Sequence, residues 1–395
     1  MPLLQQVLQA DACHLKFGSY TLYSCYGTTA NGNTFPIAFG VIFGNECKEG
    51  WITFFEFLKR IHPALNVSQN TIISDQDKGL KESIKSVMDE VGHFFCMWHR
   101  EQNIYKVCKG GNHTYSGAWL FRKLVHAKTM ASLEKIKLDS APHMSTNVLN
   151  YLNKVEDSEQ YPVARCDQGD DIYMNDRKAS SSGEAMNKAN ANMRARTAVD
   201  PVNSVLLLIN LQAGRHERLS AFLAHSCKDI LTPLGTKLMQ YTFRGPNDPI
   251  AGGVDYRKYQ INYTDDSVGD RVVCVVTYIG DTGKPHLERK CYFPNVAIMG
   301  SKFGGCSCGE QKVLGRPCHH MVAVVKSGRI LNLDKVNAMP YWFMSGNFLC
   351  GMCVNFRFLR LTDQNCHFFF PQLVNGCFYC LCHEQNCGAN SIALI

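Results

Sequence analysis

The sequence predicts an α/β protein with a mixed sheet, followed by a small metal-binding module. Three consecutive strands near the N-terminus precede alternating helices and strands, an order typical of a mixed sheet covered by helices. Cysteines and histidines near residue 310 have the spacing of zinc ligands. The 395 residues, 45% hydrophobic and 19% charged, suffice for two or three folded domains.

The first three predicted strands cover residues 5–15, 20–30 and 34–43, which are rich in β-branched, aromatic and aliphatic side chains. Gly18 separates the first two, and "NGN" is a hairpin signal before the third. Short connections of this kind indicate an antiparallel meander.

Helices and strands alternate after the meander. Residues 49–65 and 77–91 carry apolar side chains at helical spacing. The segment "NTIIS", which ends just before Asp75, and "HFFCMW" at residues 93–98 read as short buried strands. A further helix is predicted at residues 99–109.

The rest of the chain consists of several segments that differ in composition and predicted secondary structure. Residues 115–225 read as mostly helical, and Asp200 with Pro201 would open one of these helices. "RGPNDPIAGG" is a linker, and residues 271–293 read as a hairpin that turns at "DTGK". The predicted domains are 1–110 and 111–230 for the two parts of the α/β domain, 231–300 for the linker and β-hairpin, 301–335 for the metal module and 345–395 for a Cys/Phe-rich tail.

Composition narrows the class of protein. A net charge of +7 and a pI near 8.5 are compatible with a polyanionic partner. We see no signal peptide and no apolar run of about 18 residues, so no membrane span is expected. Nineteen cysteines in so long a chain favour thiols and metal ligands over disulfides, with a nuclear or cytosolic location.

The stretch "CSCGEQKVLGRPCHH" predicts a zinc site. Cys306, Cys308, Cys318 and His320 offer three thiolates and an imidazole, the set that zinc prefers. A closed set of protein ligands indicates a structural site, not a catalytic one. His319 is the competing imidazole, and the plain alternative is a group of buried thiols beside an exposed histidine. The pattern C-x-C-x9-C-x-H resembles the SWIM zinc finger.

Three acidic residues are candidates for a second metal site. Asp11 lies in the first strand, Asp75 ends a buried strand, and Glu184 begins a predicted helix. Carboxylates select hard cations such as Mg²⁺ or Mn²⁺. Each acid also has a plain explanation: Asp75 could cap the next helix, and Glu184 could be a first-turn acid. Asp77 is the nearby alternative to Asp75.

The first half of the chain resembles the Mutator-like element (MULE) transposase domain. The resemblance rests on "DACHLK", "FPIAFGVIFGNECKEGWITFFEFL", "IISDQDKGL", "FFCMWHREQN" and "SSSGEAMN", and, with the SWIM pattern, covers roughly residues 5–335. The family motifs correspond here to Asp11, Glu46 with Glu49 and Trp51, Asp75, Cys96 with His99, and Glu184 with Asn187.

This resemblance implies an RNase H-like fold in which Asp11, Asp75 and Glu184 form a DDE triad. It implies magnesium- or manganese-dependent cleavage and transfer of DNA strands at transposon ends, in the nucleus. The family places the pair Cys96 and His99 near the active site, where it resembles half of a metal or DNA-positioning motif. The alternative for Cys96 is a strand-end cysteine packed in the core.

DNA is the expected partner, with a second copy of the chain as a further candidate. Basic side chains near the third acid would contact phosphates, or would instead form a solvated helix face. These residues are Arg177, Lys178, Lys188, Arg194 and Arg196.

Two departures from the family suggest other functions. The upstream DNA-binding zinc finger of the family is missing, as expected of a fragment, a decayed copy or a protein adopted for another use. The tail pairs Cys350 with Cys353 and Cys377 with Cys380 at zinc-ribbon spacing, or is a read-through segment. The alternatives are a catalytically silent, transposase-derived regulator that binds DNA or protein, and a SWIM-containing interaction protein.

Overall fold

The computed structural model places most of the first 180 residues and the region of the Cys/His stretch. The described residues are 5–15, 20–29, 31–76, 79–107, 114–169, 172–180, 214, 233–243, 254–263, 271–280, 288–294 and 305–328, together with the backbone at 357–363, 366–373, 376–377, 381–382 and 391–394. The predicted domain boundaries near residues 110, 230, 300, 335 and 345 all fall outside these ranges and stay predictions.

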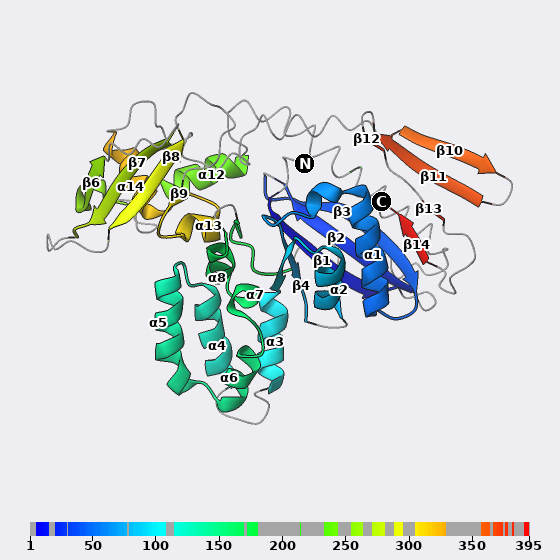
Figure 1. Ribbon diagram of the computed structural model, residues 1–395, viewed down its shortest axis with the longest axis horizontal. Coiled ribbons are helices and arrows are strands. Elements are labelled where there is room, and N and C mark those ends of the chain that lie inside the picture. The colour runs from blue at the N-terminus through cyan, green and yellow to red at the C-terminus, as the bar shows by residue number, and fades with distance from the viewer. Residues whose placement is uncertain are drawn as a thin grey trace.

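A mixed sheet lies at the centre of the first half, with the order β3-β2-β1-β4-β5 (Figure 1). The first three strands form the predicted antiparallel meander, and β4 and β5 run parallel to β1. This order and these directions make the sheet RNase H-like, as predicted. The strands are β1 (Val7–His14), β2 (Tyr20–Thr28), β3 (Thr34–Phe43), β4 (Thr71–Ser74) and β5 (Gly92–Phe95).

Two backbone segments of the tail extend this sheet at its β3 edge. β14 (Ser391–Leu394) pairs with β3, and β13 (Leu381–Cys382) pairs with β14. Three further strands form a separate sheet, namely β10 (Arg357–Asp363), β11 (Cys366–Leu373) and β12 (Gly376–Cys377).

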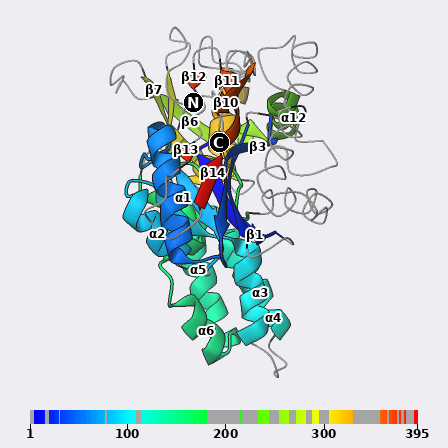
Figure 2. The same cartoon turned by 90° about the vertical axis from the view of Figure 1, so that its right-hand side faces the viewer.

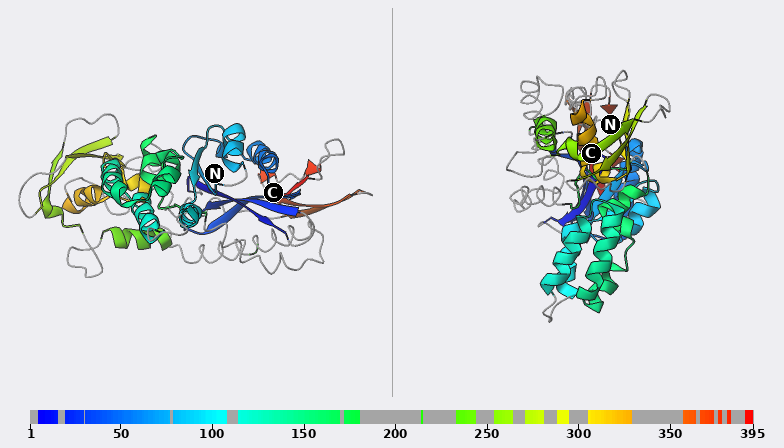
Figure 3. Two further views of the ribbon diagram at one scale, coloured as in Figure 1. Left: turned by 90° about the horizontal axis from the view of Figure 1, so that it is seen from below. Right: turned by 90° about the vertical axis from the view of Figure 1, so that its left-hand side faces the viewer.

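Helices α1 (Lys48–Ile61) and α2 (Leu80–Val87) pack on one face of the central sheet (Figures 2 and 3). Their apolar stripes recur every three or four residues, so each helix turns one side to the sheet. Trp51, Phe54 and Phe55 are buried there against strand residues. The short 3₁₀ turn η1 (Pro63–Leu65) follows α1.

The other face of the sheet meets a group of helices, which projects away from it (Figure 1). The shared core contains Val7, Ile73 and Phe94 from the strands and residues such as Phe121 from the helices. The helices are α3 (Met97–Val107), α4 (Thr114–Val125), α5 (Met130–Ser140), η2 (Ala141–His143), α6 (Thr146–Leu152), α7 (Asp157–Gln160) and α8 (Pro162–Asp167).

A second sheet, with strand order β6-β7-β8-β9, supports the Cys/His stretch. Its core joins apolar residues of the strands to α14, in which the consecutive residues 321–325 are all buried. The elements are α12 (Pro233–Thr242), η3 (Tyr256–Lys258), β6 (Tyr259–Tyr263), β7 (Arg271–Tyr278), β8 (Arg289–Pro294), β9 (Gly305–Cys306), α13 (Glu310–Leu314) and α14 (His319–Ser327).

The structure differs from the sequence prediction at several described elements, among them the end of β5, helix α12 and strand β6, where no strand was predicted. The predicted strand 93–98 ends at Phe95, because Cys96 already accepts the first helical hydrogen bond, from the N–H of Arg100 at 3.0 Å. Helix α12 falls in the segment predicted as linker and hairpin. The helix expected after Pro201 and the turn "DTGK" lie outside the described residues.

No helix in the described part of the chain has the length and apolar character of a membrane span.

Candidate metal centres

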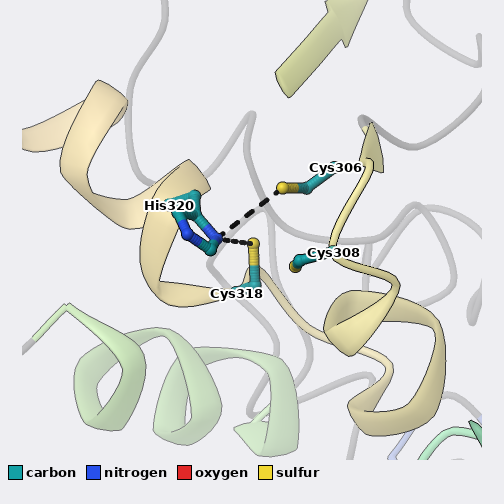
Figure 4. Close-up of side chains that lie close together, drawn as sticks. All are labelled: Cys306, Cys308, Cys318 and His320. Atoms are coloured by element: carbon teal, nitrogen blue, oxygen red, sulfur yellow. Dashed lines mark hydrogen bonds between the residues drawn. The ribbon is translucent and has the colours of Figure 1, made fainter. Parts of the chain in front are cut away.

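The Cys/His stretch brings four potential ligands together. Cys306 ends β9, Cys308 follows in the turn, and Cys318 caps the N-terminus of α14, whose second residue is His320 (Figure 4). Gly309 and Gly315 adopt positive φ at the two ends of α13, so the chain reverses and returns the second pair of ligands to the first.

The distances among these four residues fit a tetrahedral zinc site. The Nδ1 atom of His320 lies 3.8 Å from Cys306 Sγ and 4.0 Å from Cys318 Sγ. All four ligand atoms lie within 4.8 Å of one another, and all four residues are buried. With Zn–S bonds of about 2.3 Å and a Zn–N bond of about 2.0 Å, tetrahedral ligand atoms stand roughly 3.5–3.8 Å apart. A small contraction would complete the site.

The electrostatics of the cluster also favour a cation. The hydrogen bond from Cys291 lowers the pKa of Cys306, so this thiol ionises first. The hydrogen bond with Cys306 raises the pKa of Cys308 to about 12, and burial raises the pKa of Cys318 well above its usual value. Three buried thiolates repel one another, and a divalent cation among them removes that penalty.

His319, the competing imidazole, points to a different partner. Its Nδ1 lies 2.9 Å from Glu310 Oε2, and Lys128 forms an ion pair with the same carboxylate at 3.1 Å. Burial alone would raise the pKa of Glu310, but the hydrogen bond with His319 and the charge of Lys128 lower it to about 2. His320 is therefore the imidazole of the cluster.

The zinc-finger segment is docked on the helical part of the protein. Lys312 Nζ donates to the carbonyl oxygens of Gly169 at 2.8 Å and Cys166 at 3.4 Å. The main-chain N–H groups of Met174 and Asp176 donate to carbonyl oxygens of α13. Figure 1 shows α13 beside α8. The finger is thus packed against the rest of the molecule.

Asp11 and Asp75 lie on the face of the sheet opposite α1 and α2. Side chains of a strand alternate between faces. In β1, Leu8 packs with α1 and α2, whereas Val7 joins the core of the helical part. Asp11 follows Val7 by four residues and therefore shares its face. In β4, Ile73 belongs to the same side, so Asp75 does too.

The register brings the two acids to the same level. β1 and β4 are parallel and pair Val7 with Thr71 and Gln9 with Ile73. Continuing this register by two residues sets Asp11 level with Asp75, directly beyond the carboxyl end of β4. Both residues are half-buried. Neighbouring parallel strands lie about 4.8 Å apart, so carboxylates at one level of one face are close enough to share a cation.

A hydrogen-bond network fixes the main chain at Asp75. Ser74 Oγ donates to the carbonyl oxygen of Asp75 at 2.9 Å and lies 2.7 Å from His93 Nε2. Burial lowers the pKa of His93 to about 3, so the ring is neutral. On the other side, Gln76 Oε1 accepts from Asn103 at 3.3 Å and from Tyr151.

Cys96 and His99 lie beside this network, at the start of α3. The Cys96 side chain is completely buried, and its Sγ accepts the main-chain N–H of Ser180 at 3.3 Å. Met97 N donates to the carbonyl oxygen of Lys178 at 2.8 Å. Burial alone would raise the pKa of Cys96, but hydrogen bonds from His99 and Ser180 lower it. Cys96 thus fastens the segment that precedes Glu184 to the end of β5.

Several predicted site residues fall outside the described part of the chain. They are Asp77, Glu184, Asn187, Lys188, Arg194, Arg196, Cys350, Cys353 and Cys380. Cys377 is described only as backbone, in β12. Among the basic residues, Arg177 donates to the carbonyl of Gly32 at 3.5 Å, and Lys178 pairs with Asp176 at 2.7 Å. These two cations are engaged with protein groups.

Three residues of these sites were missed at the sequence level. Ser74 and His93 support Asp75, and Cys291 contacts Cys306. Ser74 and His93 become neighbours only through the parallel pairing of β4 with β5, which the sequence patterns did not predict. Cys291 required the register of β8 with β9, which the 10 residues between the two strands leave open.

Two protein-family models match the chain, one around Asp11 and Asp75 and the other around the Cys/His stretch. Residues 7–103 match the model of the MULE transposase domain, and residues 294–328 match that of the SWIM zinc finger. These matches contain Asp11 and Asp75 in one case and the whole Cys/His cluster in the other. No curated protein matches the chain. The chain thus carries a MULE transposase domain and, further along, a SWIM zinc finger.

Proposed function

We propose that this protein is a MULE-type DDE transposase, which cleaves and transfers DNA strands with Mg²⁺ or Mn²⁺ at Asp11, Asp75 and Glu184. The observation that carries the proposal is the common level and common face of Asp11 and Asp75 in an RNase H-like sheet. Two like charges so close on adjacent strands repel each other, and a divalent cation between them would offset that repulsion.

The donor set fits a hard cation. Carboxylate oxygens are the ligands that Mg²⁺ and Mn²⁺ prefer. When bound, a pair of such ions would activate the attacking oxygen and stabilise the leaving oxygen of a phosphodiester. Asp11 and Asp75 would hold the ions, and the network of Ser74, His93 and Gln76 would keep Asp75 in place.

The choice of Glu184 as the third acid is supported by the contact of a nearby residue, Ser180, with Cys96. Ser180, which donates to Cys96 Sγ, precedes Glu184 by four residues. An extended chain covers at most about 3.5 Å per residue, so this anchor limits how far Glu184 can lie from the end of β5. Cys96 and His99 would therefore act on the site by positioning the chain, with no need for a zinc of their own.

A transposase domain acts on DNA in general, so DNA is the partner we propose and the nucleus the location. The zinc finger would have a structural role, because its ligands form a closed set of four. Its close packing on the helical part suggests that it moves with the catalytic domain when DNA binds.

Nicking of supercoiled DNA by the zinc-loaded chain in Mn²⁺ tests the proposal. We expect Asp11→Asn and Asp75→Asn each to reduce nicking at least about a hundredfold, because each removes a metal ligand. Asp139→Asn, at an exposed position of α5, is the matched control and should nick like the wild type. Equal nicking by all four proteins would point to a contaminating nuclease. No metal-dependent nicking by the wild type would favour the silent, transposase-derived regulator.

A further inference from the structure

A fifth thiol, that of Cys291, touches the zinc cluster without belonging to it. Cys291 Sγ lies 3.5 Å from Cys306 Sγ. Cys291 is completely buried and Cys306 is 5% exposed. The group of mutually close ligand atoms found among the described residues contains Cys306, Cys308, Cys318 and His320, and not Cys291.

The strand register favours a bond between these two sulfurs. Cys291 of β8 is directly opposite Cys306 of β9. The hydrogen bond from Ser307 N to Lys290 O, at 2.9 Å, flanks this pair, which is therefore of the non-hydrogen-bonded type. Such pairs have Cα atoms about 4.5 Å apart and the closer side chains. This separation falls inside the range of about 4.4–6.8 Å that disulfides adopt.

Cys274 is the competing partner, on the opposite side of Cys291. The two residues are paired between β7 and β8. The N–H and C=O of Cys291 point away from β9, so its pair with Cys274 is of the hydrogen-bonded type. The Cα atoms of such pairs stand about 5.5 Å apart with more widely separated side chains. Both Cα separations lie within the range of disulfides, so the sulfur–sulfur contact of 3.5 Å is what favours Cys306 over Cys274.

We propose that Cys291 and Cys306 form an oxidation site whose disulfide excludes zinc from the SWIM finger. The oxidant is a hydroperoxide, for which hydrogen peroxide is the simplest case. The Cys306 thiolate attacks one peroxide oxygen, the O–O bond breaks, and the products are a sulfenic acid and hydroxide, which takes up a proton to become water. Cys291 then attacks the sulfenic sulfur, an S–S bond replaces the S–O bond, and the hydroxyl leaves with the thiol proton as a second water.

Disulfide formation removes one ligand from the cluster. A disulfide sulfur is no longer a thiolate, so Cys306 stops binding the ion. Cys308, Cys318 and His320 remain, one ligand short of a closed structural site, and zinc is lost. Hydrogen peroxide is close to water in size, and local opening of the two-residue strand β9 admits it.

The test treats the zinc-loaded, full-length chain with hydrogen peroxide and follows two readouts. A chromogenic chelator reports zinc release, and tryptic peptide mapping identifies the disulfide. Cleavage after lysine and arginine separates residues 291–302 from residues 303–312, and places Cys274 and Cys318 in other peptides. Fragmentation between Cys306 and Cys308 distinguishes these two. We expect a cross-link between Cys291 and Cys306 that grows in proportion to the zinc released, and a reductant should reverse it.

Two variants complete the experiment. In Cys291→Ser, zinc release should slow at least about tenfold, because the neighbouring thiol that reacts with the oxidised sulfur is gone. Cys274→Ser, a buried cysteine on the adjacent strand, should release zinc like the wild type. The absorption spectrum of the cobalt-substituted proteins shows whether each variant keeps the intact cluster.

Three results would overturn the inference: a cross-link of Cys306 to Cys308 or Cys318, a cross-link of Cys291 to Cys274, or unchanged zinc release in Cys291→Ser. The peptide map of the wild type decides the pairing even if a variant does not fold.

Discussion

At the scale of single residues, the side chains of the MULE-like motifs have identifiable partners. The indole N–H of Trp51, a completely buried residue, donates to Glu46 Oε1 at 3.0 Å. Tyr23 packs edge-on against the same ring system with centroids 4.8 Å apart. The spacing of Glu46 and Trp51 in the sequence therefore has a structural cause: the acid satisfies the one polar atom of a core tryptophan.

We expect removal of the Glu46 carboxylate to lower the stability of the fold. In Glu46→Ala the indole N–H stays buried without its acceptor, and we expect the free energy of unfolding to fall by about 1–2 kcal/mol. Urea denaturation measures the change. Glu56→Ala, at an exposed position of α1, is the control and should change the free energy by less than about 0.5 kcal/mol. Equal effects of the two substitutions would mean that the hydrogen bond is not needed.

At the scale of elements, the sequence predicted most of what surrounds the candidate carboxylate site. The meander, β4 and β5 follow from runs of β-branched, aromatic and aliphatic residues, and α1 and α2 follow from apolar residues at helical spacing. Asp11 and Asp75 were found as acids within or just after such strands. What could not be predicted is how the strands align, because register depends on contacts across the sheet. For the same reason, the contacts of Ser74 with His93 and of Cys291 with Cys306 could not be predicted.

Burial of His93, where β5 contacts Ser74 of β4, should make the stability of the fold depend on pH. The pKa of His93 is about 3 in the folded chain, lowered by burial from its ordinary 6.5. Below pH 6.5 the unfolded chain binds a proton that the folded chain does not. The contribution of His93 is therefore fully present above pH 6.5 and is lost as the pH falls towards 3, by at most about 1.4 kcal/mol per pH unit.

Unfolding curves between pH 7 and pH 4 measure this contribution. We expect the free energy of unfolding of His93→Gln to fall less steeply on acidification than that of the wild type. The difference in slope should correspond to the uptake of at most one proton. His143→Gln, at an exposed position, should keep the wild-type slope. A wild-type slope in His93→Gln would show that other groups cause the pH dependence.

At the scale of the whole molecule, the finger and the helical part are held together by close main-chain contacts. Gly315 has φ +65°, and a Cβ there would lie 2.9 Å from the Cα of Asn175. Gly328, at the end of α14, has nearly the same φ of +64°, but a Cβ there would meet nothing within 4 Å. The two glycines share one backbone requirement and differ in the docking contact.

This pair of glycines isolates the contribution of docking. Gly328→Ala should cost about 1 kcal/mol for the positive φ alone. Gly315→Ala should cost a further 1–3 kcal/mol or so, because the new methyl group forces the finger away from residue 175. Thermal unfolding of the zinc-loaded variants measures both. Equal losses would contradict the docked arrangement.

The most direct test of the account measures Mn²⁺ binding to the zinc-loaded chain without DNA, by calorimetry or by the electron paramagnetic resonance of the free ion. The account predicts saturable binding that both Asp11→Asn and Asp75→Asn abolish and that Asp139→Asn leaves intact. Binding that survives either of the first two substitutions would contradict the claim that Asp11 and Asp75 form one metal site.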